Sequence, residues 1–433
     1  MRVAPTSRAR YPAAGWSGGG IRFFAALLVV FQVVQGALDL IPSGNVRFTE
    51  SYYLVTYNHG FIRRGLLGEG LRLLFGVPTR SEVDVTADFV VVLAVAALVV
   101  TIELLIRRRT ASSYAMAILL AASPFTIDFL IVDRRPDLLA VVLLVALGIV
   151  LVRVANPLLP WLVAFGLAFG GMVLVHEDTV LIDIPWAMVL VAVATLGRNG
   201  VFVGGPRPGV ARTMVGRVAV LVAPSVIATF AVLAYGLPTT QTVAELEHDV
   251  SSFHFTGNTV FTYLPNSIHA AVHQVGAIPA GAKLHTLLLG LVLIALQLGW
   301  VASWVRPRLW SPFVQRGNRA LGTCLGAIIV IATVILFGTG FDWVRWFADC
   351  GAAWLIVQAF SPLSQRSGPG VGDTNRDEGS ITASGQPAEL QVASTGRVHL
   401  SHWLPALAVY LAMVPPLDDL FITGQLRHFF FFV

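Results

Sequence analysis

Long apolar runs determine what this chain can fold into. About 11 segments of roughly 20 residues are predominantly apolar, which is the length an α-helix needs to cross the hydrocarbon core of a bilayer. Because backbone groups in lipid must form their hydrogen bonds within the segment, each run should be a helix. The sequence therefore predicts an all-α fold, a polytopic transmembrane helical bundle. The predicted spans are about 22–42, 86–106, 113–132, 136–155, 157–175, 180–197, 216–236, 284–304, 320–338, 342–361 and 401–417.

The composition agrees with a chain surrounded by lipid. Only 12% of the residues are charged, against about 25% in a soluble domain. Arginine supplies almost all of the formal charge of +5, in short clusters between apolar runs. That arrangement follows the positive-inside rule, so membrane lipids are the expected partners and nucleic acid is not. Cys324 and Cys350 fall inside predicted spans, which argues against a disulfide framework or a zinc site.

The arginine clusters also predict an orientation. If the N-terminus is cytoplasmic, clusters such as Arg107-Arg108-Arg109 lie inside, and most acids and histidines lie outside. The basic N-terminus followed by the first span predicts a retained signal anchor. We therefore expect a multi-pass protein of the cell (plasma) membrane with a cytoplasmic N-terminus and an outer C-terminus.

The polar segments between the spans divide the chain. Residues 1–361 are predicted to form the transmembrane helical domain, with outer loops at 43–85 and 237–283. Residues 362–400 are rich in Gly, Ser and Pro and cannot bury enough apolar area to order themselves, so they predict a disordered cytoplasmic linker. Residues 401–433 are predicted to form the last transmembrane helix and an outer tail.

The first outer loop carries arginines where the charge rule predicts few. Its run 60–68 (GFIRRGLLG) places Arg63 and Arg64 between glycines, within an amphipathic stretch from Phe61 to Phe75. Guanidinium forks match phosphate oxygens bidentately, and glycines let backbone approach a ligand. The run therefore predicts a phosphate or pyrophosphate site. The alternative is that the arginines anchor an in-plane helix to lipid headgroups.

Three further ionisable clusters fall on the same predicted side. They are 133–137 (DRRPD), 176–178 (HED) and 342–346 (DWVRW). Asp137 and Asp342 suit the positive N-terminus of a helix, whereas Arg345, inside a span, needs an anionic partner. His176 and Glu177 are candidates for a general base or for metal ligands. Four clusters on one side predict a functional site at the outer leaflet.

These four motifs carry a resemblance. The runs 60–68, 135–137, 176–177 and 342–346 resemble those of a group of uncharacterised bacterial polytopic membrane proteins often found with surface-polysaccharide functions. The layout is also similar to the GT-C class of glycosyltransferases, which use a polyprenyl-phosphate sugar and an acidic residue in the first outer loop. No Asp-Asp or Asp-Glu pair stands in that loop here. The resemblance implies a membrane glycosyltransferase at the outer face, acting on a glycan or glycolipid acceptor in envelope polysaccharide or glycolipid assembly.

The resemblance also implies roles for single residues. The catalytic base would be Glu50 or Asp39; lipid phosphate would be held by Arg63, Arg64, Arg134 and Arg345; the substrate would be bound by His59, Asp133, Asp137, His176, Glu177 and Asp342. A cofactor is not implied with certainty, and a divalent cation on His176 and Glu177 stays open. Two alternatives remain: a polymerase of lipid-linked repeats, and a transporter or flippase for a lipid-linked or anionic substrate. A transporter should place charges near the bilayer midplane, whereas here most lie at span ends.

Overall fold

The regular structure of the chain is helical, as predicted. The computed structural model describes residues 18–39, 48–108, 111–122, 134–154, 158–198, 209–255, 259–277, 319–339 and 343–366, and every regular element in these ranges is a helix. The long elements are α1 (Gly18–Asp39), α3 (Arg80–Arg107), α4 (Ala111–Ala122), α6 (Leu138–Arg153), α7 (Leu159–Val175), α8 (Asp183–Arg198), α10 (Val210–Tyr235), α15 (Arg319–Thr339) and α16 (Trp343–Arg366). The short elements are η1 (Glu50–Leu54), α2 (Leu66–Phe75), η2 (Glu177–Val180), α11 (Thr240–Asp249), η3 (Val260–Thr262) and α12 (Ile268–Ala277).

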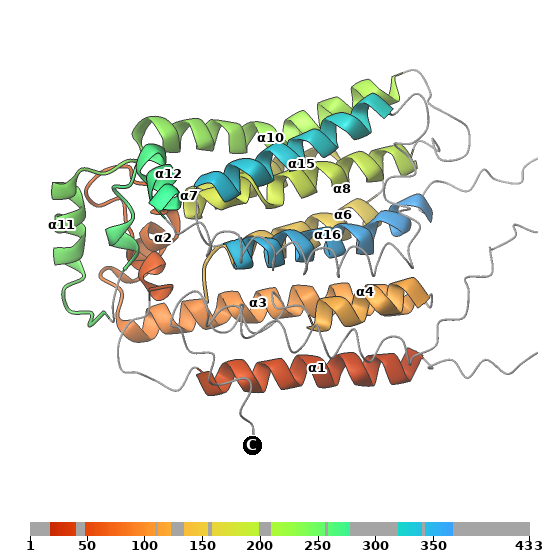
Figure 1. Ribbon diagram of the computed structural model, residues 1–433, viewed down its shortest axis with the longest axis horizontal. Coiled ribbons are helices and arrows are strands. Elements are labelled where there is room, and N and C mark those ends of the chain that lie inside the picture. Colours follow the sequence, from red (N-terminus) through yellow and green to blue (C-terminus); the bar gives the residue numbers. More distant parts are fainter. Residues whose placement is uncertain are drawn as a thin grey trace, which may run out of the picture.

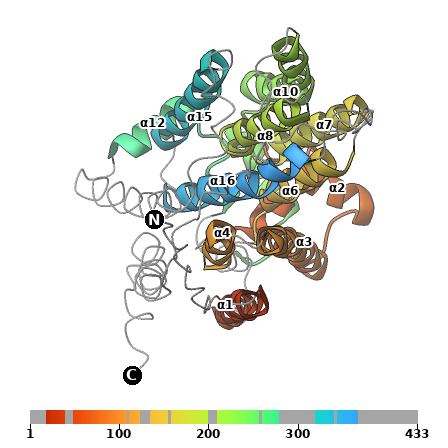
Figure 2. The ribbon, with the colours of Figure 1, turned by 90° about the vertical axis from the view of Figure 1, so that its right-hand side faces the viewer.

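The long helices run side by side along one axis, and the short elements gather at one end of the bundle (Figure 1). We call this the loop end; it comprises residues 48–79, 134–137, 176–182, 236–255 and 259–277. The opposite end, seen facing the viewer in Figure 2, carries arginines at or near helix termini. We call it the basic end; its arginines with described side chains are Arg22, Arg107, Arg108, Arg153, Arg198, Arg212 and Arg217.

Several helices are long and apolar enough to cross a membrane. By length and composition these are Arg80–Arg107, Glu177–Arg198, Val210–Tyr235 and Gly322–Thr339, with shorter apolar helices at Gly19–Val30, Leu138–Arg153 and Leu159–Val175. The predicted spans at 284–304 and 401–417 and most of the predicted linker lie outside the described residues. The count of 11 spans and the orientation therefore stay predictions. Helix α16 continues to Arg366, whereas the linker is predicted to begin at 362.

Local sequence signals set the boundaries of the elements at the loop end. The Glu82 carboxylate accepts hydrogen bonds from the Thr79 backbone N–H at 2.6 Å and from its hydroxyl at 2.9 Å, which closes a capping box before α3. Thr239 caps α11 by accepting from the Thr242 N–H at 3.1 Å. Helix α2 ends at Phe75 and is followed by Gly76, whose φ of 77° favours glycine.

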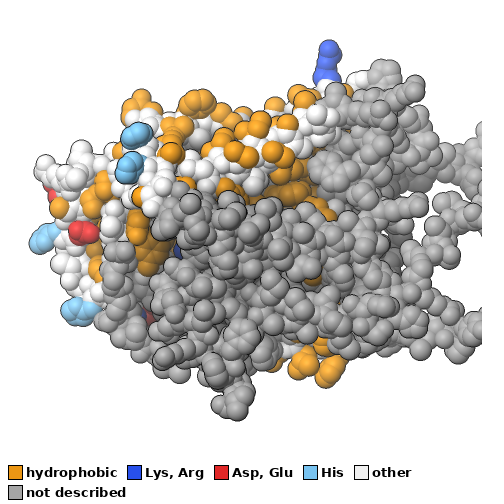
Figure 3. Space-filling model, viewed as in Figure 1, with side chains coloured by type: hydrophobic (Ala, Val, Ile, Leu, Met, Phe, Trp, Pro, Cys, Tyr) orange, Lys and Arg blue, Asp and Glu red, His pale blue; other side chains and the backbone are white. Residues whose placement is uncertain are grey.

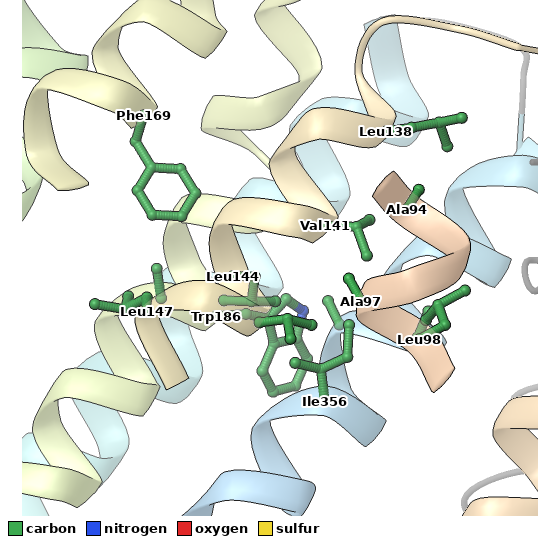
Figure 4. Packing of buried hydrophobic residues seen from close by; sticks show 14 of the residues in the cluster. Ala94, Ala97, Leu98, Leu138, Val141, Leu144, Leu147, Phe169, Trp186 and Ile356 are labelled. Atoms are coloured by element: carbon green, nitrogen blue, oxygen red, sulfur yellow. The ribbon is translucent and has the colours of Figure 1, made fainter. Parts of the chain in front are cut away.

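Small residues let the long helices approach one another closely. Gly166 and Gly170, four apart on α7, lie against the α10 backbone; a Cβ on Gly166 would fall 2.9 Å from the Leu221 carbonyl oxygen. Gly148 of α6 likewise receives the Phe360 ring of α16, 2.4 Å from where its Cβ would be. Figure 4 shows the packing between helices of the bundle, with labelled side chains that include Ala94 of α3, Leu144 of α6 and Ile356 of α16. Such contacts hold a bundle together where the surrounding lipid is as apolar as its core.

Helix α8 lies at the centre of the bundle. In the most apolar stretch of this helix, 83% of the residues are buried inside the protein, against 22% in α10 and 17% in α15. The outer helices leave apolar side chains exposed along their lengths (Figure 3), as lipid contact requires. Because η2 directly precedes α8, the residues of η2 are held by the most enclosed helix of the described chain.

Candidate functional site

The glycines of the run 60–68 serve internal packing. A Cβ on Gly68 would lie 2.0 Å from the Val55 carbonyl oxygen, and one on Gly65 would lie 2.3 Å from the Tyr57 ring. Both positions therefore require glycine so that α2 can rest on η1 and the following turn. Gly60 has a φ of 110°, with open space around it. The close approach expected for a ligand is made instead by the chain itself at Gly65 and Gly68.

Arg64 of the first loop holds Glu177 of η2 through a bidentate pair. Its Nε and Nη2 donate to Oε2 and Oε1 at 2.8 and 2.5 Å. A third donor, Nη1, reaches the Tyr52 hydroxyl at 3.1 Å. The loop run and the HED cluster, separate in sequence, thus meet in one charged contact. Bidentate pairing of this kind is the strongest hydrogen-bonded arrangement that a guanidinium makes.

Arg63 joins the two loop regions predicted to lie outside. Its Nε donates to the Leu264 carbonyl at 3.2 Å, and its Nη2 donates to the carbonyls of Tyr263 and Asn266 at 2.5 and 3.1 Å. Only Nη1 faces Glu177, at 3.3 Å. Three of the hydrogen bonds of this guanidinium therefore go to backbone carbonyls of the turn after η3, and one goes to Glu177.

An aromatic ring stands at the centre of the site. The Tyr52 ring stacks on the His176 imidazole with centroids 5.5 Å apart, and the guanidinium carbon of Arg64 lies 5.3 Å from the same ring. Arg135 lies 5.8 Å from both the Tyr52 and the Phe48 rings. Such cation–π contacts stabilise guanidinium groups that have lost solvent. Tyr52 therefore orders basic groups from three separate clusters.

The HED cluster also meets the late motif 342–346. The Trp346 indole N–H donates to Asp178 at 3.1 Å, so the start of α16 is fixed to η2. His176 Nδ1 accepts from the Asp178 backbone N–H at 3.4 Å, which assigns its proton to Nε2. Within the described chain that buried Nε2 has no hydrogen-bond partner. Burial lowers the pKa of His176, so the imidazole is neutral at pH 7.

Arg134 forms a second ionic cluster, with carboxylates of two elements. Its Nη1 bonds Glu50 at 2.9 Å and lies 3.9 Å from Asp84, while Nη2 bonds Asp88. Glu50 is 2% exposed, whereas the Asp88 side chain is 64% exposed. The Tyr53 hydroxyl donates to the Arg134 carbonyl at 2.9 Å. One buried arginine thus fastens η1 to the first turns of α3.

Both clusters contain a strained arginine. Arg64 and Arg134, with φ of 66° and 48°, are the non-glycine residues with positive φ in the described chain. An L-residue adopts this conformation at a cost and only where its surroundings enforce it, which happens most often at functional sites. The side-chain contacts of each arginine supply that enforcement.

A third contact closes the loop end over its exposed face. His59 Nε2 lies 2.9 Å from Asp249 and its Nδ1 lies 3.2 Å from Glu245, while the Asn58 amide donates to Asp249 at 3.1 Å. Hydrogen bonding from His59 and Asn58 holds the pKa of Asp249 below its usual range despite slight burial. These contacts join the first loop to α11, and Figure 3 shows histidine side chains on this end of the surface.

The buried arginines respond differently to the same surroundings. Burial lowers the pKa of Arg63. Arg64 is also desolvated, but the attraction of Glu177 outweighs burial and raises its pKa. Both guanidinium groups stay charged at neutral pH.

Burial, followed by the nearby Glu69 carboxylate, raises the pKa of Tyr57 to about 12, so the phenol stays neutral.

The structure places the predicted site residues unevenly. Arg63, Arg64, His176 and Glu177 meet directly, and Arg134 with Glu50 and His59 with Asp249 lie at the same end. Asp137 lies beside α6 at this end. Four other candidates are not described in full. Only the helical backbone is described for Asp39 and Arg345, and Asp133 and Asp342 lie outside the described residues.

Several site residues were missed by sequence reasoning. Tyr52, Asp84 and Asp88 contact the predicted residues but were not singled out from the sequence. The spacing of Asp84 and Asp88, four apart at the start of α3, was the available clue because it puts two acids on one helical face. Within the described residues no three His, Cys, Asp or Glu side chains are placed to hold a metal ion. In this part of the chain the divalent cation considered for His176 and Glu177 thus lacks a third ligand.

Comparisons with known proteins agree on a membrane family. The family described as "Uncharacterised membrane protein Rv1490" matches residues 19–243, just over half of the chain. The proteins Rv1490 and MT1536 of Mycobacterium tuberculosis and Mb1527 of Mycobacterium bovis are each 29% identical over 153 residues. Each alignment covers 34% of this chain and 34% of the relative, so the chain spans about a third of the relatives' length. No solved structure matches.

The family match covers the first three motifs and ends before Trp346. Together with several helices able to span a bilayer, it establishes a membrane location. The chain belongs to the Rv1490 family of membrane proteins.

Proposed function

We propose that the protein is a membrane glycosyltransferase of GT-C-like type that uses a polyprenyl-phosphate-linked sugar at the outer face, in envelope polysaccharide or glycolipid assembly. One observation carries the proposal: two adjacent arginines hold a carboxylate bidentately at the end of a membrane bundle. A phosphate group presents oxygens to such a pair in the same fork geometry. The phosphate of a lipid in the adjoining leaflet would arrive at this depth.

The chemistry needs a leaving group and a base. The bond between the sugar anomeric carbon and the lipid phosphate oxygen breaks, and the phosphate leaves with the electron pair. The acceptor hydroxyl forms the new bond and loses its proton to a carboxylate. Arg64 and Arg63 offset the charge that develops on the departing phosphate.

The carboxylates near Arg134 supply candidates for the base. Glu50 is buried against Arg134, so an acceptor would reach it only after rearrangement. Asp88 bonds the same arginine from the surface and extends the candidate set formed by Glu50 and Asp39. We therefore assign proton transfer to the acids of this region, with Arg134 fixing their positions.

Placement of charge favours chemistry over transport. The described charged side chains lie toward helix ends, and α6, α7 and α15 have none at their centres. A transporter or flippase should hold charges near the midplane on broken helices. A polymerase of lipid-linked repeats would use the same phosphate site and differs in its acceptor, so an acceptor screen separates it from a single-sugar transferase.

Binding of a polyprenyl phosphate to the full chain purified in detergent tests the proposal. Wild type should bind saturably, and Arg64→Gln should weaken binding by about 10-fold or more, because a charged hydrogen bond contributes about 1.5–3 kcal/mol. Arg72→Gln is the matched control, since Arg72 pairs only locally with Glu69 on α2. It should bind like wild type.

Arg63 is left unchanged in this test because its carbonyl contacts hold the turn after η3. Absence of binding to wild type would refute the glycosyltransferase and the polymerase together. If Arg64→Gln and Arg72→Gln weakened polyprenyl phosphate binding equally, the binding would be a general attraction between arginines and phosphate headgroups and not a specific site.

A further inference from the structure

The Glu177 carboxylate occupies the position of an anionic ligand. Both its oxygens are held by guanidinium groups, Oε1 by Arg64 at 2.5 Å and by Arg63 at 3.3 Å, and Oε2 by Arg64 at 2.8 Å. A bound phosphate monoester or diester would seek the same donors. The protein's own carboxylate therefore competes with any such ligand.

The Glu177 carboxylate is held by the two arginines, whereas each arginine also has contacts besides Glu177. Within the described chain, the carboxylate accepts hydrogen bonds from these two guanidinium groups alone. Arg63 keeps three backbone carbonyls, and Arg64 keeps the Tyr52 hydroxyl and ring. If Glu177 left, both donors would remain close to their present positions.

The neighbours of Glu177 anchor the backbone around it. His176 stacks on Tyr52, and Asp178 accepts from the Trp346 indole. Of the three HED side chains only Glu177 holds the guanidinium fork, and its side chain is 27% exposed, against 1% for His176. A rotation of this one side chain would open the fork without moving η2.

We propose that Glu177 is a built-in competitor that fills the Arg63–Arg64 anion site until a phosphate group displaces it. The inference rests on the proposed function and adds a source of selectivity. Headgroup phosphates are abundant in any bilayer, and a carboxylate tethered beside the arginines acts at a high effective concentration. Only a phosphate carried by a ligand with further contacts would outcompete it, so weakly held headgroups are rejected.

Substitution of Glu177 with anion titration tests this inference. Glu177→Gln in the full chain in detergent should bind inorganic pyrophosphate at least about 10-fold more tightly than wild type, because the competing charge is gone. Without anion the variant should unfold at a lower temperature, and pyrophosphate should raise its melting temperature more than that of wild type. Glu177→Asp keeps the charge on a shorter side chain. Its affinity for pyrophosphate should lie between those of wild type and Glu177→Gln.

Glu69→Gln is the matched control, since Glu69 is another carboxylate paired with an arginine in the same loop region. It should leave pyrophosphate binding unchanged. Equal or weaker binding by Glu177→Gln would overturn the inference and make Glu177 a positioning residue for Arg64.

The same variants separate this inference from the proposed function. Tighter pyrophosphate binding by Glu177→Gln, with no binding of polyprenyl phosphate by either protein, would retain the competitor and reject the lipid substrate. Saturable polyprenyl phosphate binding by wild type that Glu177→Gln does not improve would retain the lipid site and reject the competitor.

Discussion

The two ends of the bundle use arginine in different ways. At the basic end, Arg198 donates to the carbonyls of Leu151 and Val154, both at 2.5 Å, and Arg108 donates to the Gln358 carbonyl at 3.2 Å. Leu151 and Val154 lie at the C-terminal end of α6, where a cation also meets the negative end of the helix dipole. Arg22 and Arg107 also share the Glu103 carboxylate, in exposed pairs at 3.0 and 2.8 Å. At the loop end, Arg64 and Arg134 instead pair with carboxylates from distant segments where little solvent reaches the guanidinium groups.

This difference separates anchoring from function. A basic residue at a helix end can bond backbone carbonyls, which any residue supplies, and an exposed ion pair loses little solvent. Arginines with positive φ that are buried against acids from other segments cost more to maintain, in backbone strain and in desolvation. Since simple anchoring would not require that cost, the loop end is where binding or chemistry is expected.

The largest expected effect concerns which end faces outward. In a chain whose Cys324 and Cys350 are replaced, Gln241→Cys on α11 marks the loop end and Thr213→Cys on α10 marks the basic end; both positions are exposed. In intact cells a membrane-impermeant maleimide should label position 241 and leave position 213 unlabelled, because arginine-rich ends stay cytoplasmic.

Permeabilised cells provide the control, since both positions should then react. Labelling of position 213 alone in intact cells would place the loop end in the cytoplasm. An outer-face donor could not then reach the site.

A large stability difference should separate arginines of the two ends. Arg134→Gln removes the charged partner of buried Glu50 and should lower the free energy of unfolding by about 3–5 kcal/mol. Arg107→Gln removes an exposed partner of Glu103, which also pairs with Arg22, and should cost under about 1 kcal/mol. Denaturant unfolding in detergent, followed by tryptophan fluorescence, measures both.

Glutamine suits both tests because it removes the charge while keeping the first three side-chain carbons and a polar end. Equal losses for the two variants would end the distinction between the ends, since they would give the two ion pairs the same energetic weight.

Two glycines of α2 should respond in opposite directions. Gly68→Ala places a methyl group 2.0 Å from the Val55 carbonyl oxygen, so α2 must shift at a cost of about 1–3 kcal/mol. Gly70→Ala meets nothing within 4 Å and should stabilise the helix by about 0.5–1 kcal/mol. Thermal unfolding of both variants measures the difference, and a harmless Gly68→Ala would show that α2 does not pack on η1.

Sequence reasoning predicted the helices better than the contacts between loops. The predicted apolar runs that fall in the described residues coincide with helices, because lipid favours a helix in a segment of that length. Gathering of the first and third motifs was also predicted, and Arg64 does pair with Glu177. Asp88 was not identified, because it lies in the first residues of a predicted span, where a charged residue is expected at the membrane surface.

Other contacts left no trace in residue identity. Arg63 bonds the carbonyls of Tyr263, Leu264 and Asn266, and any residue could supply a carbonyl there. The glycines of the run 60–68 were correctly singled out, but the reason is a neighbouring backbone and a tyrosine ring. Such reasons depend on the path of the loop, which hydropathy and motif spacing do not determine.

The smallest expected effect concerns the contact of His59 with α11. Asp249→Asn should lower the free energy of unfolding at pH 7 by less than about 1 kcal/mol, because the Asp249 side chain is 39% exposed and water screens the pair. Its pKa is held low in the folded state by His59 and Asn58, so the stabilisation is fully present above the ordinary pKa of about 4. It is lost as the pH falls through the lower folded pKa.

The difference in stability between wild type and Asp249→Asn should therefore shrink below about pH 4. Glu247→Gln on the same helix is the control, since Glu247 makes no ion pair within the described chain. Its effect should stay near zero from pH 3 to pH 7, about the range over which these carboxylates titrate. A difference for Asp249→Asn that grows on acidification would mean that His59 does not stabilise the ionised carboxylate, and α11 would then be held to the first loop by other contacts.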